Sequence, residues 1–409
     1  MLLAPSSAGR SRSPAAPTAI ENADAGAILS ETSTFHQMEN SMSHRTHPSA
    51  RVLGSLAVAC AAALPGTALA SFSLTSLGPE SSGGTATAYG TSANGSVHAG
   101  WSTGPSGVRA TRWSIGSAAA FLNPTNSYAF AVSGDGQSMV GYQGGSAPRA
   151  FRWTASGTSE ELSLLSGGLG AAATNINSDG TVIVGHGLRS DGQNRAIRWV
   201  GDAALDIGLL SGSSGASQAW DVSADGSVVV GFSSTTSASQ RAFRWTAAGG
   251  MVDLGSLGET SQARGVSDDG STVVGFSTLA SGAWRGFRWT AGAGMEDLGS
   301  LGGDTTIARS TNRDGSIVVG TSRLASGVDR AFIWSQPTGM VELSALLAAN
   351  GVDLSGWTLQ SALSISADGS TIVGSGLFNG QSRGFAAVIP APGVLPLVAA
   401  AALLRRRRR

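Results

Sequence analysis

The chain has 409 residues, of which 58 are Gly, 13% are charged and one is Cys. The formal net charge is zero, and positions 71–389 contain 17 Arg against 22 Asp and Glu, a net charge of 17 − 22 = −5. This balance argues against nucleic acid and anionic membrane surfaces as partners. A segment of about 320 residues can bury a large core without disulfides.

The first 70 residues divide into two parts. Residues 1–41 are polar and low in complexity, and we expect a mis-called or disordered leader, with translation starting at Met42 or Met38. Residues 42–70 combine a basic stretch, an apolar run and small residues before Ser71. This pattern is typical of a secretory signal peptide cleaved between Ala70 and Ser71. In the alternative of a lipoprotein signal, Cys60 would be the lipid acceptor.

A repeated unit fills the rest of the chain as far as residue 389. It is marked by seven turn dipeptides, which lie 41, 44, 46, 44, 45 and 54 residues apart. They are Asn94-Gly95, Asp135-Gly136, Asp179-Gly180, Asp225-Gly226, Asp269-Gly270, Asp314-Gly315 and Asp368-Gly369. A period of this size predicts a repeat architecture.

Each unit is expected to contain four short antiparallel strands. In the unit that starts at Gln262, a strand precedes Asp269-Gly270, and the Val-rich STVVGFS follows that dipeptide. RGFRWT and MEDLGSL supply the third and fourth strands. The dipeptide predicts a two-residue hairpin turn, because Gly accepts a positive φ. The repeats show no sustained 3.6-residue apolar period, so we expect no helix in them.

Seven units of four strands predict an all-β, seven-bladed β-propeller over residues 71–389. The last unit stops near residue 389 without a fourth strand, while residues 72–78 (FSLTSLG) resemble the fourth strand at residues 252–258 (VDLGSLG). An N-terminal strand would therefore close the ring and remove its open edges. An open β-solenoid is the alternative.

Two residue types recur at fixed places in the units. We expect the recurring Trp to pack against a neighbouring blade, and these residues are Trp113, Trp153, Trp199, Trp245, Trp289 and Trp334, with Ala387 in the last unit. The recurring Gly ends the second strand and predicts a close backbone approach; the set is Gly100, Gly141, Gly185, Gly231, Gly275, Gly320 and Gly374.

Residues 390–409 form a separate tail. Pro390, Ala391 and Pro392 interrupt the repeats, residues 394–404 are apolar, and five Arg end the chain. Eleven apolar residues are short for a stable transmembrane span. We therefore expect a tail that holds the protein in the membrane transiently, with the Arg cluster on the cytoplasmic side.

This tail resembles the PEP-CTERM sorting signal read by exosortase, with Pro390-Ala391-Pro392 at the place of Pro-Glu-Pro. The repeats resemble the HAF family of extracellular repeats through Arg149-Ala150-Phe151, Arg241-Ala242-Phe243 and Arg330-Ala331-Phe332. The two resemblances imply a protein of a Gram-negative-type bacterium that is exported to the cell surface or the extracellular space. An exosortase-like processing enzyme is the implied partner, and no reaction is implied.

Arginine is the strongest candidate for a ligand site. One Arg holds the same place in all seven units, and in a closed ring this set would form a circle: Arg109, Arg149, Arg195, Arg241, Arg285, Arg330 and Arg383. Such a ring could grip an anionic polysaccharide through bidentate carboxylate contacts. The alternative is that each Arg pairs with an acid within or between blades. A second set repeats in five units: Arg112, Arg152, Arg198, Arg244 and Arg288.

Other chemistry has few candidates. His98 and His186 are the only His after residue 70 and lie in different units, so we expect no metal site and no cofactor. Turn chemistry explains the repeated Asp-Gly better than calcium loops do, and no nucleophile motif stands out. We predict a monomeric, non-enzymatic cell-surface or extracellular-matrix protein that binds carbohydrate or protein through propeller loops. The alternatives are a purely structural matrix protein and a polysaccharide-acting enzyme.

Overall fold

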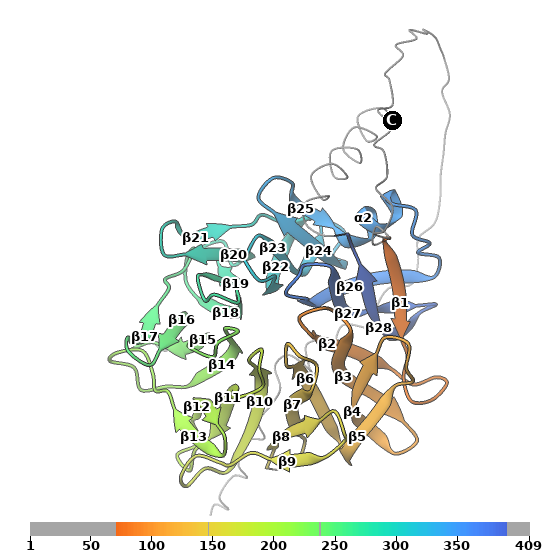
Figure 1. The fold of residues 1–409 in the computed structure, drawn as a ribbon. Helices are drawn as coiled ribbons and strands as arrows, with labels where there is room; N and C mark the ends of the chain where they lie inside the picture. The colour runs from red at the N-terminus through yellow and green to blue at the C-terminus, as the bar shows by residue number, and fades with distance from the viewer. Residues whose placement is uncertain (1–70, 146, 237–238, 391–409) are drawn as a thin grey trace, which may run out of the picture. The chain divides into compact units, whose positions relative to one another are not determined.

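The computed structural model describes residues 71–145, 147–236 and 239–390, and their regular secondary structure is almost entirely antiparallel β-strand (Figure 1). The prediction of an all-β fold with four-stranded antiparallel sheets is confirmed. The predicted leader 1–41, the signal peptide 42–70 and the tail after Pro390 lie outside the described residues, as do Ala70, Ala391 and Pro392.

Four sheets follow one another in the chain, each made of four consecutive strands. The first holds β2 (Ala86–Thr91), β3 (Val97–Gly104), β4 (Gly107–Ser114) and β5 (Ala120–Thr125). The second holds β6 (Ser127–Val132), β7 (Ser138–Gln143), β8 (Arg149–Thr154) and β9 (Ser159–Glu161). The third holds β10 (Gly170–Ile176), β11 (Val182–Leu188), β12 (Asn194–Val200) and β13 (Ala203–Asp206). The fourth holds β14 (Ser217–Val222), β15 (Val228–Ser234), β16 (Gln240–Thr246) and β17 (Gly250–Asp253).

The next sheet has eight strands and consists of two such groups. One group is β18 (Ser261–Val266), β19 (Thr272–Thr278), β20 (Trp284–Thr290) and β21 (Gly294–Asp297). The other is β22 (Gly302–Thr311), β23 (Ile317–Leu324), β24 (Asp329–Ser335) and β25 (Gly339–Glu342). A single parallel pairing, Trp284 with Thr305, joins the two groups.

The last sheet combines the two ends of the described chain. It holds β26 (Trp357–Ile365), β27 (Thr371–Phe378) and β28 (Gln381–Val388), and its fourth strand is β1 (Ser73–Leu77). β1 lies antiparallel beside β28, from Ser73 opposite Val388 to Leu77 opposite Gly384 (Figure 1). The predicted displacement of the missing strand to residues 72–78 is confirmed by this pairing.

One helix corrects the expectation that the repeats contain none. α2 (Leu343–Ala349) follows β25, and its buried residues are Leu343, Leu346 and Leu347. Their spacing of three and four residues gives one apolar stripe, but the helix is too short to show a sustained period in the sequence. Within the described ranges, no helix has the length and apolar character needed to cross a membrane.

The Asp-Gly dipeptides form turns, although not the two-residue turns that we predicted. In the fourth sheet the amide of Gly226 donates to the carbonyl of Ser223 at 2.9 Å, and the amide of Ser223 donates to the carbonyl of Val228 at 2.9 Å. Asp225 and Gly226 are thus the third and fourth residues of a β-turn. Only Gly226 has a positive φ, 73°, whereas a type I′ turn requires a positive φ at both central residues.

Backbone hydrogen bonds join each turn to the next. The amide of Ala224 donates to Asp268 at 3.0 Å, that of Asp268 to Arg313 at 3.0 Å, and that of Arg313 to Ala367 at 3.0 Å. The same contact runs through the earlier turns, from Ala93 to Gly134, from Asp135 to Ser178 and from Ser178 to Ala224. The amide of Asp368 then donates to the carbonyl of Ala93 at 3.3 Å, so the last turn is bonded to the first.

The recurring Gly of the second strand has the close backbone contact that the sequence predicts. A Cβ on Gly231 would overlap the carbonyl oxygen of Gln218 on β14, and the other six Gly of this set face an inner-strand carbonyl in the same way. Beside each of them the first strand contains a β-bulge; in β14 it lies between Ala219 and Asp221. A bulge leaves one residue of the strand unpaired and turned away from the ladder.

The recurring Trp packs between sheets. Trp153 on β8 is fully buried and shares an apolar cluster with Val97 and Leu122 of the preceding sheet. Its indole N–H donates to the carbonyl of Asn123 at 2.6 Å. Trp199 makes the equivalent bond to Ser163 at 2.8 Å. The expected packing of these residues against a neighbouring unit is therefore confirmed for both.

Gly231→Ala tests the close contact, because the new methyl group must push apart two paired strands. We expect a loss of about 1–3 kcal/mol in the free energy of unfolding, the usual cost of overpacking, measured by urea denaturation. Gly292→Ala is the control, since a Cβ there has no neighbour within 4 Å. An equal, small effect at both positions would contradict the proposed role of Gly231.

Candidate functional site

The seven arginines of the predicted ring lie on the third strands β4, β8, β12, β16, β20, β24 and β28, and local acceptors hold them. Four form ion pairs: Arg109 with Glu80 at 3.3 Å, Arg149 with Glu161 at 3.5 Å, Arg285 with Asp297 at 3.9 Å and Arg330 with Glu342 at 3.2 Å. Four donate to backbone carbonyls, Arg285 among them: Arg195 to Gly215, Arg241 to Glu259, Arg285 to Asp304 and Arg383 to Gly84. These contacts tie neighbouring segments together, and the ligand-ring hypothesis remains a prediction.

The second set of arginines joins one sheet to the next turn. Arg198 and Arg244 donate to the carbonyls of Gly226 and Gly270, at 3.0 Å and 3.1 Å. Arg112 and Arg288 make the same bond to Gly136 and Gly315. These four guanidinium groups therefore hold the Asp-Gly turn of the following unit in place, whereas the fifth member of the set, Arg152, donates to the hydroxyl of Ser138 at 3.3 Å.

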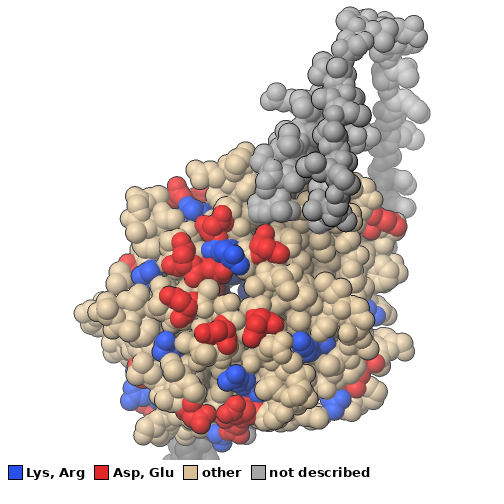
Figure 2. Space-filling model, viewed as in Figure 1, with Lys and Arg blue, Asp and Glu red and all other residues tan. Residues whose placement is uncertain are grey.

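The turn carboxylates are occupied by the turns themselves. Oδ1 of Asp225 accepts hydrogen bonds from the Ser223 hydroxyl at 2.6 Å and from the amide of Ser227 at 2.9 Å. These bonds lower the pKa of Asp225, the Ser223 hydroxyl most strongly. In Figure 2, Asp and Glu side chains gather near the middle of one face, with Arg among them.

The two His lie on strands of different sheets, β3 and β11. Both are buried, and burial lowers the pKa of each to about 4, so both are neutral at pH 7. Nδ1 of His98 lies 3.0 Å from the hydroxyl of Thr91. Across the described part of the chain, no three His, Cys, Asp or Glu side chains converge in a way that could hold a metal ion.

The β-bulges in the first strand of each unit present residues that the sequence pattern did not mark as candidates. Each bulge displaces one residue of the first strand, and these residues are Tyr89, Phe130, Thr174, Trp220, Arg264, Arg309 and Leu363. They hold equivalent places in the seven units. Five of these seven displaced residues are aromatic or Arg. The turn and strand patterns in the sequence do not identify them.

Four of the side chains near these bulges form what we call the aromatic–arginine cluster: Trp220, Arg264, Phe276 and Trp284. The guanidinium carbon of Arg264 lies 4.2 Å from the ring centre of Trp220 and 5.5 Å from that of Phe276. Phe276 stacks on Trp284 with ring centres 4.8 Å apart and an interplanar angle of 13°. Trp284 is 41% exposed, so the cluster reaches the surface there.

Two buried donor or acceptor atoms beside this cluster lack a hydrogen-bond partner among the described residues. They are Nε1 of Trp220 and Nδ1 of His186. The rings of His186 and Trp220 lie 6.2 Å apart, and His186 is only 7% exposed. An indole N–H can only donate, and leaving it buried and unpaired costs about 1–3 kcal/mol. A ligand that supplies an acceptor would recover that free energy.

A second group of rings occupies the equivalent places of the first two units. Tyr128 stacks on Tyr142 at 5.1 Å, and Tyr142 stacks on Phe130 at 5.6 Å. Trp101 and Tyr89 contact this pair edge to face, at 6.0 Å from Tyr128 and 5.1 Å from Phe130. This group contains no Arg, so it offers ring faces without a cation.

Asp221, next to Trp220, supports the strands that carry the cluster. Its carboxylate accepts from the amides of Val222 and Val266, both at 2.8 Å, and from the side-chain amide of Asn175. It therefore links β10, β14 and β18. Desolvation by burial raises the pKa of Asp221 to about 7, although the three N–H donors act in the opposite direction.

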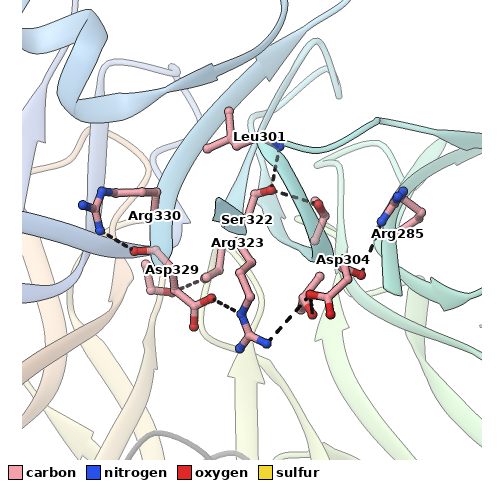
Figure 3. A network of polar contacts seen from close by, with 11 residues as sticks. Arg285, Leu301, Asp304, Ser322, Arg323, Asp329 and Arg330 are labelled. Carbon is pink, nitrogen blue, oxygen red and sulfur yellow. Dashed lines mark hydrogen bonds and ion pairs between the residues drawn. The ribbon is translucent and has the colours of Figure 1, made fainter. Parts of the chain in front are cut away.

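An open pocket of about 570 Å³ adjoins Trp284. Its lining includes Arg285, Asp304 and Arg323, together with Gly302, Gly303 and Gly327. Nε of Arg323 lies 3.0 Å from Asp329, and one of its terminal nitrogens lies 3.9 Å from Asp304. Figure 3 shows Arg323 between these two acids, with Arg285 on the other side of Asp304.

No protein-family model and no curated protein matches the chain. Several solved structures share the fold. An oligogalacturonate lyase from Vibrio parahaemolyticus is similar with a TM-score of 0.55 and 11% identity, over 79% of this chain and 98% of the lyase. A puromycin hydrolase variant is similar with a TM-score of 0.51 and 15% identity, over 74% of this chain and 53% of the hydrolase.

TolB from Acinetobacter baumannii is a more distant similarity, with a TM-score of 0.44 and 12% identity. That match covers 76% of this chain and 65% of TolB. At these identities the similarities show the fold alone. The lyase and hydrolase similarities agree with the architecture of four-stranded antiparallel sheets described above.

The function predicted from the sequence is wrong. We expected a non-enzymatic surface or matrix protein that binds through its loops, yet solved structures of this fold include a lyase and a hydrolase. The sequence offered no catalytic motif, and we inferred a non-enzymatic class from that absence. Fold and missing motifs do not decide function, and here the side chains that could recognise a ligand lie on strands, Trp220 on β14, Arg264 on β18, Phe276 on β19 and Trp284 on β20.

The pKa of Asp221 predicts a specific pH dependence. The folded state holds this proton more tightly than the unfolded chain, whose Asp pKa is 3.8. The resulting stabilisation is complete below about pH 4 and is lost as the pH rises through about 7. Relative to Asp221→Asn, the native chain should therefore lose stability between pH 5 and pH 8, by at most about 1.4 kcal/mol per pH unit.

Urea denaturation of both proteins across this range measures the difference. The lowered pKa values of His98 and His186 act with the opposite sign, but equally in both proteins, so they cancel. A difference that stays constant from pH 5 to pH 8 would show that Asp221 is ionised throughout.

Proposed function

We propose that the sheets form a closed, seven-bladed β-propeller, with the eight-stranded sheet contributing two blades. Three observations support this proposal: the turn-to-turn hydrogen bonds that return from Asp368 to Ala93, the contact of β26 and β27 with β2, and the pairing of β1 with β28. An open solenoid predicts none of these contacts between first and last units.

A disulfide across the β1–β28 pair tests this closure. Ser73→Cys with Val388→Cys places two thiols on opposed residues, which is within bonding reach in an antiparallel pair. With Cys60 replaced by Ser, we expect a disulfide and a gain of about 2–4 kcal/mol in the free energy of unfolding. Ser73→Cys with Ala386→Cys is the control, because it is two residues out of register. Equal crosslinking of both pairs, or of neither, would count against closure.

We also propose that the chain is exported and cut at both ends, as its resemblance to HAF repeats and PEP-CTERM tails implies. β1 begins two residues after Ser71, and β28 ends two residues before Pro390. The folded part thus fits between the two expected processing sites. The intact mass of the exported protein measures this, and a mass that retains residues 1–41 would refute the proposed start.

We propose that the aromatic–arginine cluster binds a small acidic ligand with a flat ring face, for which hexuronic acids are the test case. The observation that carries this is the Arg264 guanidinium held against Trp220, beside an indole N–H that lacks an acceptor. A guanidinium pairs with a carboxylate through charge-assisted hydrogen bonds, and the exposed face of Trp284 suits a sugar ring. The fold similarity to an oligogalacturonate lyase supports the choice of ligand class.

Calorimetric titration with galacturonate, and with uncharged galactose for comparison, tests this proposal. We expect galacturonate to bind and galactose to bind far more weakly. Arg264→Gln should weaken galacturonate binding at least about tenfold, the equivalent of about 1.4 kcal/mol. Arg149→Gln removes the same charge on the distant β8 and should have no effect. Equal binding of both sugars, or an unchanged affinity in Arg264→Gln, would refute the site.

The prediction that the chain catalyses no reaction is tested with the same protein. The protein is incubated with oligogalacturonate, and two readouts are measured: the release of reducing ends and the absorbance of unsaturated products. The appearance of either product would contradict that prediction and leave the binding site intact. Because Arg264→Gln removes the proposed carboxylate partner, it should abolish any turnover that is found.

A further inference from the structure

We propose that the pocket beside Trp284 is a second subsite for a carboxylate, so that the ligand is an oligomer of acidic sugars rather than a single one. This inference rests on the binding site proposed above. The two places are adjacent, because Trp284 of the aromatic–arginine cluster pairs with Thr305 of β22, next to Asp304 in the lining of the pocket.

The pocket offers the cations that such a subsite needs. Its lining contains Arg285 and Arg323 together with one acid, Asp304, and Arg285 also lies 3.9 Å from Asp297, whose side chain is 41% exposed. Asp329 holds Arg323 at 3.0 Å, and the contact with Asp304 is longer, at 3.9 Å. The Asp304 side chain is 72% exposed, so a ligand carboxylate can take its place beside Arg323 at little cost.

Unit six departs from the repeat at this point. Arg323 stands where the other units have Thr103, Gly144, Leu188, Ser234, Thr278 and Leu377. Opposite it, the register between Gly302 and Thr306 is shifted, so that residues 303–305 bulge from β22. A Cβ on Gly303 would overlap the carbonyl of Arg323. Unit six thus differs from the other units by an added cation, Arg323, and by a hollow lined with backbone atoms. These two differences fit a ligand site better than a purely structural role.

The order of cations and aromatic rings along this surface suits an oligomer of acidic sugars. Arg264 lies at one end, the stacked pair Phe276 and Trp284 lies between, and Arg285 with Arg323 lies at the other end. One sugar carboxylate would meet Arg264, a ring face would lie on Trp284, and the carboxylate of a later sugar would enter the pocket. An acidic peptide could supply the charges, but it has no ring face to place on Trp284.

Affinity as a function of chain length tests the inference in the full protein. Galacturonate with one to four units is titrated by calorimetry, and we expect the affinity to rise at least about tenfold from the monomer to the tetramer. Arg285→Gln should remove most of that rise and leave monomer binding unchanged. Arg149→Gln, the same substitution at the equivalent place of another unit, should keep the rise. Asp304→Asn should enlarge it, because it removes a competing carboxylate.

The outcomes separate the two proposals. If the monomer does not bind, the aromatic–arginine site is wrong. If the monomer binds but the affinity is independent of length, or if Arg285→Gln and Asp304→Asn leave the rise unchanged, the second subsite is wrong and the first stands. Tetraglutamate that binds as tightly as tetragalacturonate would show that the ligand is an acidic peptide, which overturns the sugar oligomer. Urea denaturation of each variant identifies any loss of folding.

Discussion

The arrangement of this protein depends on a contact between a glycine of each second strand and a carbonyl of the strand beside it. With no side chain at Gly231 or Gly275, the first strand can approach closely and form its bulge. The bulge turns one residue out of the ladder in every unit. Trp220 and Arg264 owe their mutual contact to this, because each is the displaced residue of its own strand. The same backbone device therefore sets the architecture and presents the side chains of the candidate site.

Repetition supplies the scaffold, and departures from it supply the chemistry. The arginines of the two repeated sets bind carbonyls or acids, mostly at the borders between sheets, and one of them, Arg285, also lines the pocket. Arg264 and Arg323 are arginines that do not repeat throughout the chain, and they lie at the cluster and at the pocket. In a repeat protein, a charged residue that recurs in every unit is therefore poor evidence for ligand binding. A charged residue found in only one or two units is better evidence.

Much of the fold could be predicted from the sequence, because hairpin turns, strand patterns and the period each have a local physical cause. The four-stranded sheets and the displaced strand at residues 72–78 are of this kind. The candidate site was not predicted, because it depends on bulges that join distant residues. A signal was nevertheless present: Ala219, Ala263 and Ala308 each precede the displaced residue, which varies between units. The helix α2 was missed because seven residues cannot establish a period.

The partnership of β1 with β28 has a consequence for how the chain reaches its folded state. The two strands are separated by about 300 residues, which is an extreme sequence separation for a strand pair. During synthesis the first strand to emerge has no partner until the final one is complete, and its apolar Leu77 stays unburied for that time. Unpaired strand edges promote aggregation. The cell that makes this protein therefore has to keep the nascent chain from associating until its last strand is available.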